Sequence, residues 1–511
     1  MADICATRDT RATITSMYIS IMLLFFPLFT GFSGYGSITF SKYIFFVITT
    51  ATWLMAIIAI SLIGRPPKPS LSIGQYLALA FAAACLVSFL LSPHRSESLI
   101  GAGRYEGLVT QLLYVCIFLG VSLFGRSREY HLWALGISVL GCSVVGIIQL
   151  FNIDIFRLFM GHYSHYDAGL KYSGAFLGTM GNTNILSAFY CLALPALFSL
   201  PVVSSKKRAF LALIPLCPAL FVLIRVWVSG GLLALGVCAL IAAPLLLTDT
   251  GRLRRFLIAA APMLLSASTA LAFSPVYDLV SFSWSFDFKG LPAMLIIAAL
   301  CCGALGLILP RLNFKPSKGA LRRFFVVVSI AVILLGLVLV YFSGSTEGTV
   351  YELRELLHGR VNEKFGSSRI LIWRECLKLF PEHPIFGSGP DTLALRVDVK
   401  FSRFVEETGK TLRSGVDNAH NEYLGYLINI GALGLGLYLS LLVMGLRKWL
   451  YQLCSPICGA LGLGCLCYCI QSFFALGLPL VSPLFWILLA LLFQQDGNKL
   501  SEPEHGIEEI I

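Results

Sequence analysis

Long apolar runs recur along the whole chain and constrain its fold more than any other feature of the sequence. A helix that crosses a membrane needs about 20 mostly apolar residues. The chain of 511 residues contains fourteen such runs, at 16–33, 43–64, 71–92, 107–125, 130–151, 183–203, 209–224, 228–248, 256–274, 290–310, 323–343, 422–445, 449–474 and 479–495. The sequence therefore predicts an all-α, polytopic helical membrane protein with about 12–14 transmembrane helices.

The composition excludes several other classes of protein. Charged residues make up 13% of the chain and hydrophobic residues 57%, whereas about 25% of a soluble domain is charged. Too few ionisable side chains are present to coat the surfaces of two to four soluble domains. An ordinary soluble enzyme, a disordered protein and a disulfide-stapled secreted domain are therefore excluded.

The distribution of basic residues predicts the orientation. Lys and Arg concentrate in short cytoplasmic loops. With the N-terminus inside, the inner segments hold 20 basic residues and the short outer loops hold 6. The first run follows Arg8 and Arg11 without a small-x-small cleavage site, which predicts an uncleaved signal anchor. We expect a multi-pass protein of the cytoplasmic (inner) membrane with both termini cytoplasmic.

The predicted organisation has four parts. Residues 1–343 form an N-terminal transmembrane bundle of about 11 spans, and residues 344–421 form one long extracytoplasmic (periplasmic or extracellular) loop. Residues 422–495 form the C-terminal transmembrane helices, and residues 496–511 form a cytoplasmic tail. The long loop holds 11 basic and 11 acidic residues, so the net charge of +11 lies in the rest of the chain. This charge indicates orientation in a lipid bilayer, and no nucleic-acid partner is expected.

The long outer loop contains a predicted amphipathic helix. Ser367 and Ser368 are candidate N-caps, and Pro381 ends the helix after Phe380. Arg369 and Trp373 are four residues apart and share one face.

Two further helix starts are predicted in this loop. Pro390 suits a first helical turn, and the second helix would run towards Phe404. Asp417 or Asn418 is a candidate cap for the next helix, which would place His420 in its first turn at the outer membrane face.

Arg369 and His420 suit the head group of a lipid-linked diphosphate at this boundary. Arginine offers a planar fork for phosphate oxygens, and histidine exchanges a proton near neutral pH. The structural alternatives are a solvated helix charge for Arg369 and an interfacial residue at a helix start for His420.

Three motifs in this order resemble the O-antigen ligase and O-antigen polymerase (Wzy-type) superfamily of polytopic membrane glycosyltransferases. They are Ser368-Arg369-Ile370-Leu371-Ile372-Trp373, Pro384-Ile385-Phe386-Gly387-Ser388-Gly389, and His420-Asn421-Glu422-Tyr423-Leu424 followed by Gly431. Gly101-Ala102-Gly103-Arg104-Tyr105-Glu106-Gly107 and Gly181-Asn182-Thr183-Asn184 also resemble segments of some members. Together with the number of spans, the resemblance covers most of residues 70–495.

The resemblance implies transfer of a glycan from undecaprenyl diphosphate to an acceptor hydroxyl at the outer face of the membrane, with inversion and with diphosphate as leaving group. It implies that Arg369 holds the diphosphate and stabilises its growing charge. His420 would be the general base or a second phosphate contact, and Asn421 would orient the acceptor or His420. Trp373, on the Arg369 face, is a candidate substrate contact.

The resemblance also implies substrate-binding roles for other residues, most of which have a structural alternative. Arg104 is a candidate contact for diphosphate or sugar, or a snorkelling loop cation, and Glu106 belongs to the same candidate substrate-binding motif. Asn182 and Asn184 are substrate-binding candidates that could equally cap a span.

One position departs from the superfamily pattern. Many members carry Ser-Arg-Gly at the outer start of a mid-chain span, where this chain has Ser229-Gly230-Gly231. Arg225 is a candidate substitute for the missing arginine, or a snorkelling interfacial residue.

Several alternatives for the function remain. The predicted first outer loop, residues 34–41, has no Asp or Glu, which argues for a metal-independent enzyme; no metal or other cofactor is expected. The acceptor could be a glycan, a lipid or a protein, so a polysaccharide polymerase and a protein O-oligosaccharyltransferase are alternatives to a ligase. A bicarbonate-type membrane transporter is the alternative from another class, and a degenerate homologue is the third.

Overall fold

The structure is a computed structural model of the chain. It describes residues 2–64, 70–151, 153–159, 178–273, 290–312, 314–405, 410–453 and 455–494. The predicted cytoplasmic tail 496–511 lies outside the described residues, as do Arg65, Lys68, Lys171, Lys289 and Lys499 of the basic residues counted above.

Within these ranges, eleven helical segments are long and apolar enough to cross a membrane. The helices in them are α1 (Ala2–Leu28), α2 (Ile38–Gly64), α3 (Ile73–Leu91), α6 (Glu129–Leu150), α7 (Thr183–Val203), α8 (Leu213–Val226), α9 (Ser229–Leu246), α10 (Thr250–Ala272), α11 (Leu291–Ile308), α12 (Lys318–Tyr341) and α16 (Gly431–Tyr451). Three shorter apolar helices are α5 (Leu108–Phe124), α17 (Pro456–Gln471) and α18 (Ser482–Leu492). Each of the fourteen predicted runs overlaps one of these helices, and the polytopic helical fold is confirmed.

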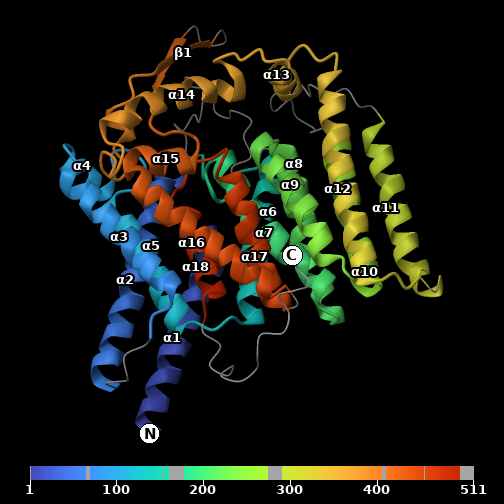
Figure 1. Cartoon of the computed structure of the whole chain (residues 1–511), viewed down its shortest axis with the longest axis horizontal. Helices are drawn as coiled ribbons and strands as arrows, with labels where there is room; N and C mark the ends of the chain where they lie inside the picture. The colour runs from blue at the N-terminus through green and yellow to red at the C-terminus, as the bar shows by residue number, and fades with distance from the viewer. Residues whose placement is uncertain are drawn as a thin grey trace.

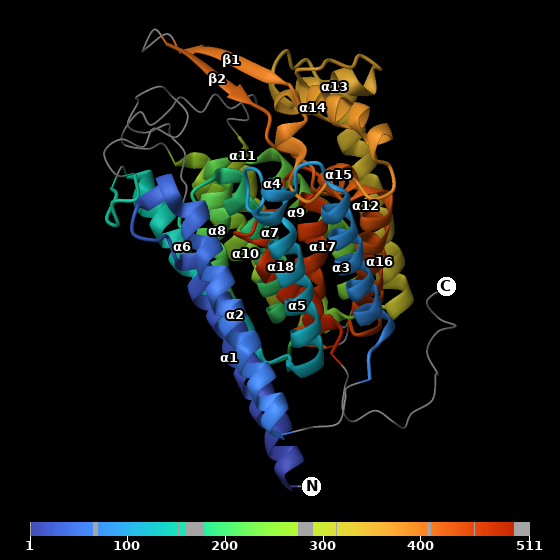
Figure 2. The ribbon, with the colours of Figure 1, turned by 90° about the vertical axis from the view of Figure 1, so that its left-hand side faces the viewer.

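Two central helices form the middle of the bundle. In α7, 89% of the most apolar stretch of 18 residues is buried inside the protein. Every residue of α18 is buried. By contrast, only 6% of the most apolar 18-residue stretch of α12 is buried. Figure 1 shows α11 and α12 at one side of the bundle, away from α18, and Figure 2 shows α1 and α2 side by side at its edge. Because α12 is apolar all round, its exposed faces suit contact with lipid.

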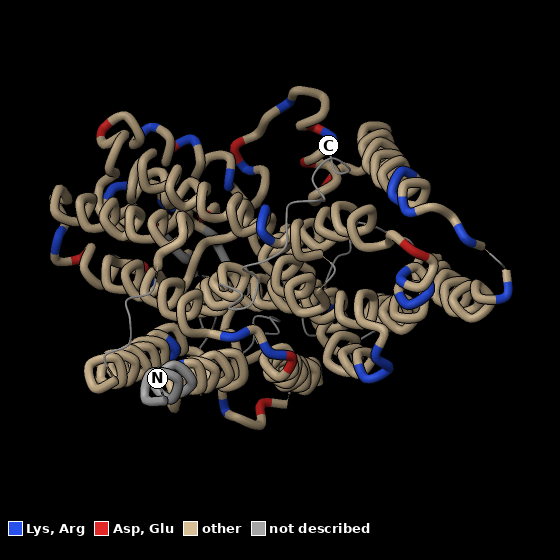
Figure 3. Tube along the Cα trace, turned by 60° about the horizontal axis from the view of Figure 1, so that its bottom comes forward, with Lys and Arg blue, Asp and Glu red and all other residues tan. Residues whose placement is uncertain are grey.

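Basic residues lie mainly at the ends of the long helices, which Figure 3 shows as blue segments at the turns of the tube. One such end is fixed by Gln494, whose Oε1 accepts hydrogen bonds from the backbone N–H and the hydroxyl of Ser127, each at 2.8 Å. The last described residue therefore lies beside the connection between α5 and α6, which also carries Arg126 and Arg128.

The segment between α12 and α16 lies across one end of the bundle (Figure 1, top). Its elements are α13 (Gly348–Leu357), α14 (Phe365–Leu379), α15 (Glu422–Asn429) and an antiparallel hairpin of β1 (Lys400–Val405) and β2 (Lys410–Gly415). In the hairpin, Lys400 pairs with Gly415 and Val405 with Lys410. The remaining helix in this region is α4 (Arg95–Ile100), which precedes α5. We call this end of the bundle the α14 end.

The predicted second helix from Pro390 to Phe404 is wrong. After Pro390 the chain makes a turn, with Asp391 at a φ of +54°, and then a single short 3-10 turn over Leu393–Leu395. The following residues Val397, Val399 and Phe401 alternate and pack on the cluster beneath α14. This spacing of two residues is the pattern of a strand with one buried face.

The predicted span 422–445 is interrupted at Gly431, which separates α15 from α16. Gly431 has a φ of +78°, and a Cβ there would lie 2.2 Å from the carbonyl oxygen of Ile385. Gly387 has a φ of +69°, and its Cβ would lie 2.4 Å from the backbone of Asn429. Only glycine fits both the left-handed backbone and this close approach. The Pro384–Gly389 turn therefore packs directly against the break between α15 and α16.

Candidate active site

A second hydrophobic cluster holds α14 against the bundle. Its buried members come from α14, the 3-10 turn, the segment after β2 and α15: Ile372, Cys376, Leu393, Val416, Ala419 and Ile428. Trp373 packs on this cluster and donates from Nε1 to the carbonyl oxygen of Ala419 at 2.9 Å. Its ring also meets Phe473 edge-on, with centroids 5.5 Å apart. One turn of α14 is therefore attached directly to the residue before His420.

Arg369 begins the right-handed part of α14. The three preceding residues, Gly366, Ser367 and Ser368, have φ values of +58° to +65°. The side chains of Ser367 and Ser368 make no capping hydrogen bond, so the predicted N-caps are wrong. Left-handed serines cost about 1–2 kcal/mol each, which leaves backbone strain directly before Arg369.

The Arg369 guanidinium has unused hydrogen-bonding capacity. Nη1 donates to the carbonyl oxygen of Gly366 at 3.2 Å, whereas the buried Nε has no partner among the described residues. Burial lowers the pKa of Arg369, and the Glu352 carboxylate opposes this shift. Arginine nevertheless keeps its proton at neutral pH. A half-buried cation whose buried Nε lacks a partner among the described residues is suited to bind an anion.

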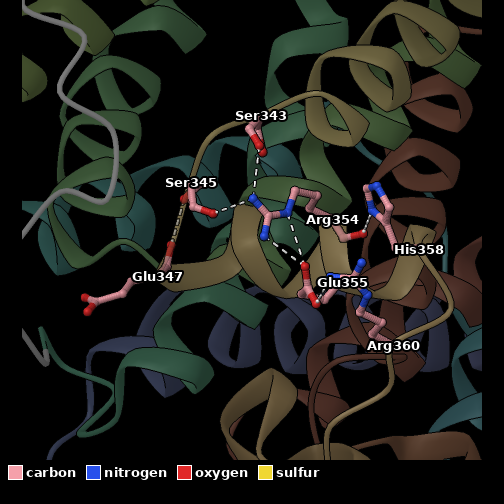
Figure 4. Close-up of polar contacts among 7 residues, drawn as sticks. All are labelled: Ser343, Ser345, Glu347, Arg354, Glu355, His358 and Arg360. Carbon is pink, nitrogen blue, oxygen red and sulfur yellow. Dashed lines mark hydrogen bonds and ion pairs between the residues drawn. The ribbon is translucent and has the colours of Figure 1, made fainter.

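Helix α13 supplies Glu352 and is fixed to the end of α12. Figure 4 shows Arg354, whose Nη1 donates to the carbonyl oxygens of Ser343 and Ser345 at 3.1 and 3.0 Å. Its Nη2 donates to Glu355 at 2.9 Å. From this anchored helix, Glu352 accepts the backbone N–H of Gly366 at 3.0 Å. A carboxylate therefore lies near Arg369 before any ligand is bound.

His420 lies between α14 and the start of α15. Asn421 is the N-cap of α15, and its Oδ1 accepts from the N–H of Leu424 at 3.0 Å. The prediction that Asp417 or Asn418 caps this helix is therefore wrong, and His420 precedes the helix with a φ of +48°. Its backbone N–H donates to Asn418 Oδ1 at 2.9 Å.

The imidazole of His420 makes no hydrogen bond with the described residues. Burial, together with the nearby charge of Arg369, lowers its pKa to about 4. Asp417 and Arg104 also act on this pKa, in opposite directions. The imidazole is therefore neutral at pH 7 and able to accept a proton. Arg369, His420 and Arg104 are thus brought within electrostatic reach of one another from distant parts of the chain.

Arg104 reaches the site from the loop between α4 and α5. Its Nε and Nη2 both lie 2.7 Å from Oδ2 of Asp417. Asp417 Oδ1 also accepts a hydrogen bond from the side chain of Asn418, which in turn holds the backbone of His420. Arg104 is therefore an ion-paired residue at the site rather than a snorkelling loop cation.

Asp391 holds the Arg104 loop in place. Its Oδ2 accepts from the backbone N–H of Arg104 at 3.1 Å and of Glu106 at 3.3 Å. Its backbone carbonyl accepts from the N–H of Ala102 at 3.2 Å. Burial raises the pKa of Asp391 to about 6, although these N–H groups favour its charged form. Sequence reasoning missed this residue, whose one signal is its place directly after the Gly-x-Gly-Pro turn.

A narrow cleft joins these loops to α15. Its polar lining residues are Arg104, Glu106, Gln111, Asp391, Asp417, Asn418, Asn421, Glu422, Tyr426 and Asn429. Glu106 accepts from Tyr114 at 2.7 Å and from Gln111 at 2.8 Å, and burial raises its pKa well above its usual value. Glu422, a member of the His420 motif that was given no role, accepts from Tyr438 at 2.7 Å and Ser472 at 2.9 Å.

The remaining candidates lie elsewhere. Asn182 caps α7, because its Oδ1 accepts from the N–H of Asn184 at 2.8 Å. Asn184 lines a separate small cavity with Tyr468. Arg225 is buried and donates from Nη1 to the carbonyl oxygen of Ala270 at 3.2 Å, between α8 and α10. The structure therefore favours capping for Asn182 and contradicts a snorkelling, solvent-facing role for Arg225.

Gly230 is in close contact with a neighbouring loop. A Cβ at position 230 would lie 2.8 Å from the Cβ of Phe474. Phe474 adjoins Phe473, which contacts Trp373. The space that a side chain at position 230 would need is thus filled by an aromatic residue.

Comparison with known proteins identifies the class of this region. Residues 256–439 match the model of the Wzy_C family, described as O-antigen ligase. The matched range runs from α10 into α16 and includes Arg369 and His420. The resemblance to the O-antigen ligase and Wzy-type superfamily is confirmed over this range. The match supports a membrane-embedded, glycosyltransferase-like enzyme of O-antigen ligase type. No curated protein matches the chain.

Proposed function

We propose that this protein transfers a glycan from a polyprenyl (undecaprenyl) diphosphate donor to an acceptor hydroxyl, as an O-antigen ligase does in surface polysaccharide biosynthesis. The observation that carries the proposal is the proximity of two groups: Arg369, a half-buried cation whose Nε has no partner among the described residues, and the imidazole of His420, whose pKa is lowered by burial and by Arg369. Among the residues that the structure describes, neither the Nε of Arg369 nor the imidazole of His420 has a hydrogen-bond partner. A diphosphate beside a hydroxyl nucleophile would use both.

In the proposed reaction, the acceptor oxygen attacks the anomeric carbon from the face opposite the diphosphate. The new carbon–oxygen bond forms as the bond to the diphosphate oxygen breaks, so the configuration inverts. Arg369 binds the diphosphate and stabilises the negative charge that grows on it. Arg104 is the second cation, and it would exchange part of its contact with Asp417 for a phosphate oxygen. No metal ion is needed for this charge stabilisation.

His420 takes the proton from the acceptor hydroxyl. In the free protein it is a weak base because burial and Arg369 lower its pKa. A bound diphosphate would neutralise part of the positive charge of Arg369 and Arg104 and so raise this pKa. Donor binding would therefore strengthen the base that the second substrate needs. Asn421 and Trp373 position the loop that carries His420, and Glu106 is one of the residues that line the cleft.

The α14 end is proposed to be the outer face of the cytoplasmic membrane, with both chain termini in the cytoplasm. This orientation rests on the excess of Lys and Arg in the connections at the opposite end. The residues 344–421 then form an extracytoplasmic catalytic segment between the transmembrane parts 1–343 and 422–495.

The test is a transfer assay with the full-length protein reconstituted in proteoliposomes. Undecaprenyl-diphosphate-linked glycan is incubated with candidate glycan, lipid or protein acceptors. We expect Arg369→Ala and His420→Ala each to reduce transfer by roughly 10²–10³-fold. Arg374→Ala and His383→Ala are matched controls, because both residues are exposed in the same segment. Full activity of the Arg369 and His420 variants at matched expression would contradict the proposal.

The same assay separates the alternatives. Single transfer to a saccharide on lipid identifies a ligase, growth of a polyprenyl-linked chain identifies a polymerase, and transfer to a polypeptide identifies a protein O-oligosaccharyltransferase. Movement of bicarbonate across the liposome membrane without any lipid-linked donor would instead identify a transporter.

A further inference from the structure

A groove between α1 and α6 lies far from the candidate active site. It opens next to the connection between α5 and α6, whereas Arg104 lies just before the start of α5. The 17 residues of α5 separate these two positions by about 25 Å along the helix axis. The groove therefore belongs to the opposite end of the bundle.

One part of this groove is polar and basic. It has a volume of about 370 Å³ and is lined by Ala12, Thr13, Ser16, Met17, Ser20, Ile21, Arg126, Arg128 and Tyr130. Two arginines and no carboxylate occur among these described residues. The guanidinium of Arg128 and the hydroxyl of Tyr130 make no hydrogen bond or ion pair with described residues, and both residues are exposed. An anion entering the groove would thus find available donors.

The apolar part continues along α1 from the same residue, Ile21. This second groove, of about 460 Å³, is lined by Ile21, Phe25, Leu28, Phe29 and Phe45. Met17, Ile21 and Phe25 are spaced four apart on one face of α1, and Phe29 continues this row directly after the helix ends at Leu28. Met17 and Phe25 are 59% and 55% exposed. From Met17 to Phe29 the helix rises about 18 Å, a little more than half the roughly 30 Å hydrocarbon core of a bilayer.

We propose that this α1 groove binds one anionic phospholipid. The lipid phosphate lies against Arg126 and Arg128, and one acyl chain runs along Ile21, Phe25 and Phe29. The lining residues change along the groove in the same order as the parts of a phospholipid. Cations and hydroxyls lie at the membrane boundary, where the phosphate lies, and aromatic side chains lie at the depth of the acyl chains. Basic pockets between transmembrane helices bind anionic head groups in this way.

The experiment measures lipid retained by the full-length protein, in the absence of any glycan donor. The protein is extracted in detergent, titrated with phosphatidylglycerol or phosphatidylcholine of the same acyl chains, and analysed by native mass spectrometry. The double variant Arg126→Gln/Arg128→Gln removes the cations, and Ser16→Trp fills the groove without changing charge. Arg322→Gln/Arg323→Gln is the matched control, since it removes two exposed cations from the start of α12.

We expect phosphatidylglycerol to bind more tightly than phosphatidylcholine, and its affinity to fall about tenfold in the double variant. Ser16→Trp should lose the bound lipid as well, and Arg126→Lys/Arg128→Lys should retain part of it. Equal loss in the α12 control would show a general surface charge effect and overturn the proposal. Equal affinity for both lipids, or a second copy of the chain covering the groove with no bound lipid, would also overturn it. Because no transfer activity is measured, failure here leaves the proposed function untouched.

Discussion

The guanidinium of Arg104 and the carboxylate of Asp417 meet in an ion pair with two nitrogen–oxygen distances of 2.7 Å, although 313 residues separate them in the sequence. This pair joins the loop before α5 to the segment that carries His420. Both side chains are about one-third exposed, so the pair itself adds little to stability. Its position suggests a functional use, in which the cation is held ready and exchanges its partner when a phosphate arrives.

Replacing Arg104 should therefore affect donor binding more than folding. For Arg104→Gln we expect the KM for undecaprenyl-diphosphate-linked glycan to rise roughly tenfold, which corresponds to one charge-assisted hydrogen bond. The thermal unfolding midpoint in detergent should change little. Initial rates measured against donor concentration test this expectation. Arg95→Gln, an exposed cation in the neighbouring α4, is the control and should leave KM unchanged; a comparable rise there would point to a general charge effect.

The partly buried imidazole of His420 should make stability depend on pH. Its pKa is about 4 in the folded protein and about 6.5 in an unfolded chain. Between these values the unfolded state binds more protons, so the free energy of unfolding rises with pH. The contribution of His420 is complete above about pH 6.5 and is lost as the pH falls through 4.

This dependence can be measured with His420→Gln. The unfolding midpoint of the wild type should fall more steeply between pH 7 and pH 4.5 than that of the variant. His383→Gln is the control, because His383 is exposed, and it should follow the wild type. Parallel curves for all three proteins would show that His420 is not held in its neutral form.

The membrane helices could be predicted from the sequence because each is a contiguous run of apolar residues. The motifs also located Arg369, Trp373, His420 and Arg104 correctly at one end of the bundle. Both kinds of pattern depend on neighbours along the chain: hydrophobicity sets the helices, and short runs of named residues set the motifs.

The partners across the site could not be predicted in the same way. Asp391 holds the backbone of Arg104 from a position 287 residues away, and no local pattern contains that information. A helix is predicted after Pro390 because a proline suits the first helical turn, whereas this segment forms a turn, a 3-10 turn and then β1. The alternation of Val397, Val399 and Phe401 is the signal of an extended chain with one buried face.

We expect the carboxylate of Glu352 to compete with the phosphate groups of the donor for the positive charge of Arg369. Its carboxylate accepts the N–H of Gly366 at 3.0 Å and attracts the charge of Arg369. Glu352→Gln removes that negative charge and keeps a hydrogen-bond acceptor. We expect the donor to bind about two- to fivefold more tightly, in line with a partly exposed charge pair. Equilibrium binding of fluorescent undecaprenyl-diphosphate glycan tests this. Glu363→Gln, whose carboxylate pairs with Arg374, should bind as the wild type does, and weaker binding by Glu352→Gln would refute the competition.

The final prediction concerns Gly230, the position at which the sequence departs from the superfamily pattern described above. A Cβ at this position would lie 2.8 Å from the Cβ of Phe474, and a second contact follows at 3.4 Å to its Cγ. Because a β-carbon cannot move aside without its backbone, Gly230→Arg should destabilise the protein by about 1–3 kcal/mol. Adding Phe474→Gly removes both the Cβ and the ring that the new side chain would meet, and we expect the double variant to recover part of the lost thermal stability. Unfolding midpoints in detergent compare the wild type, both single variants and the double variant. If Gly230→Arg alone is as stable as the wild type, Phe474 does not exclude an arginine. The presence of glycine at position 230 then has another reason.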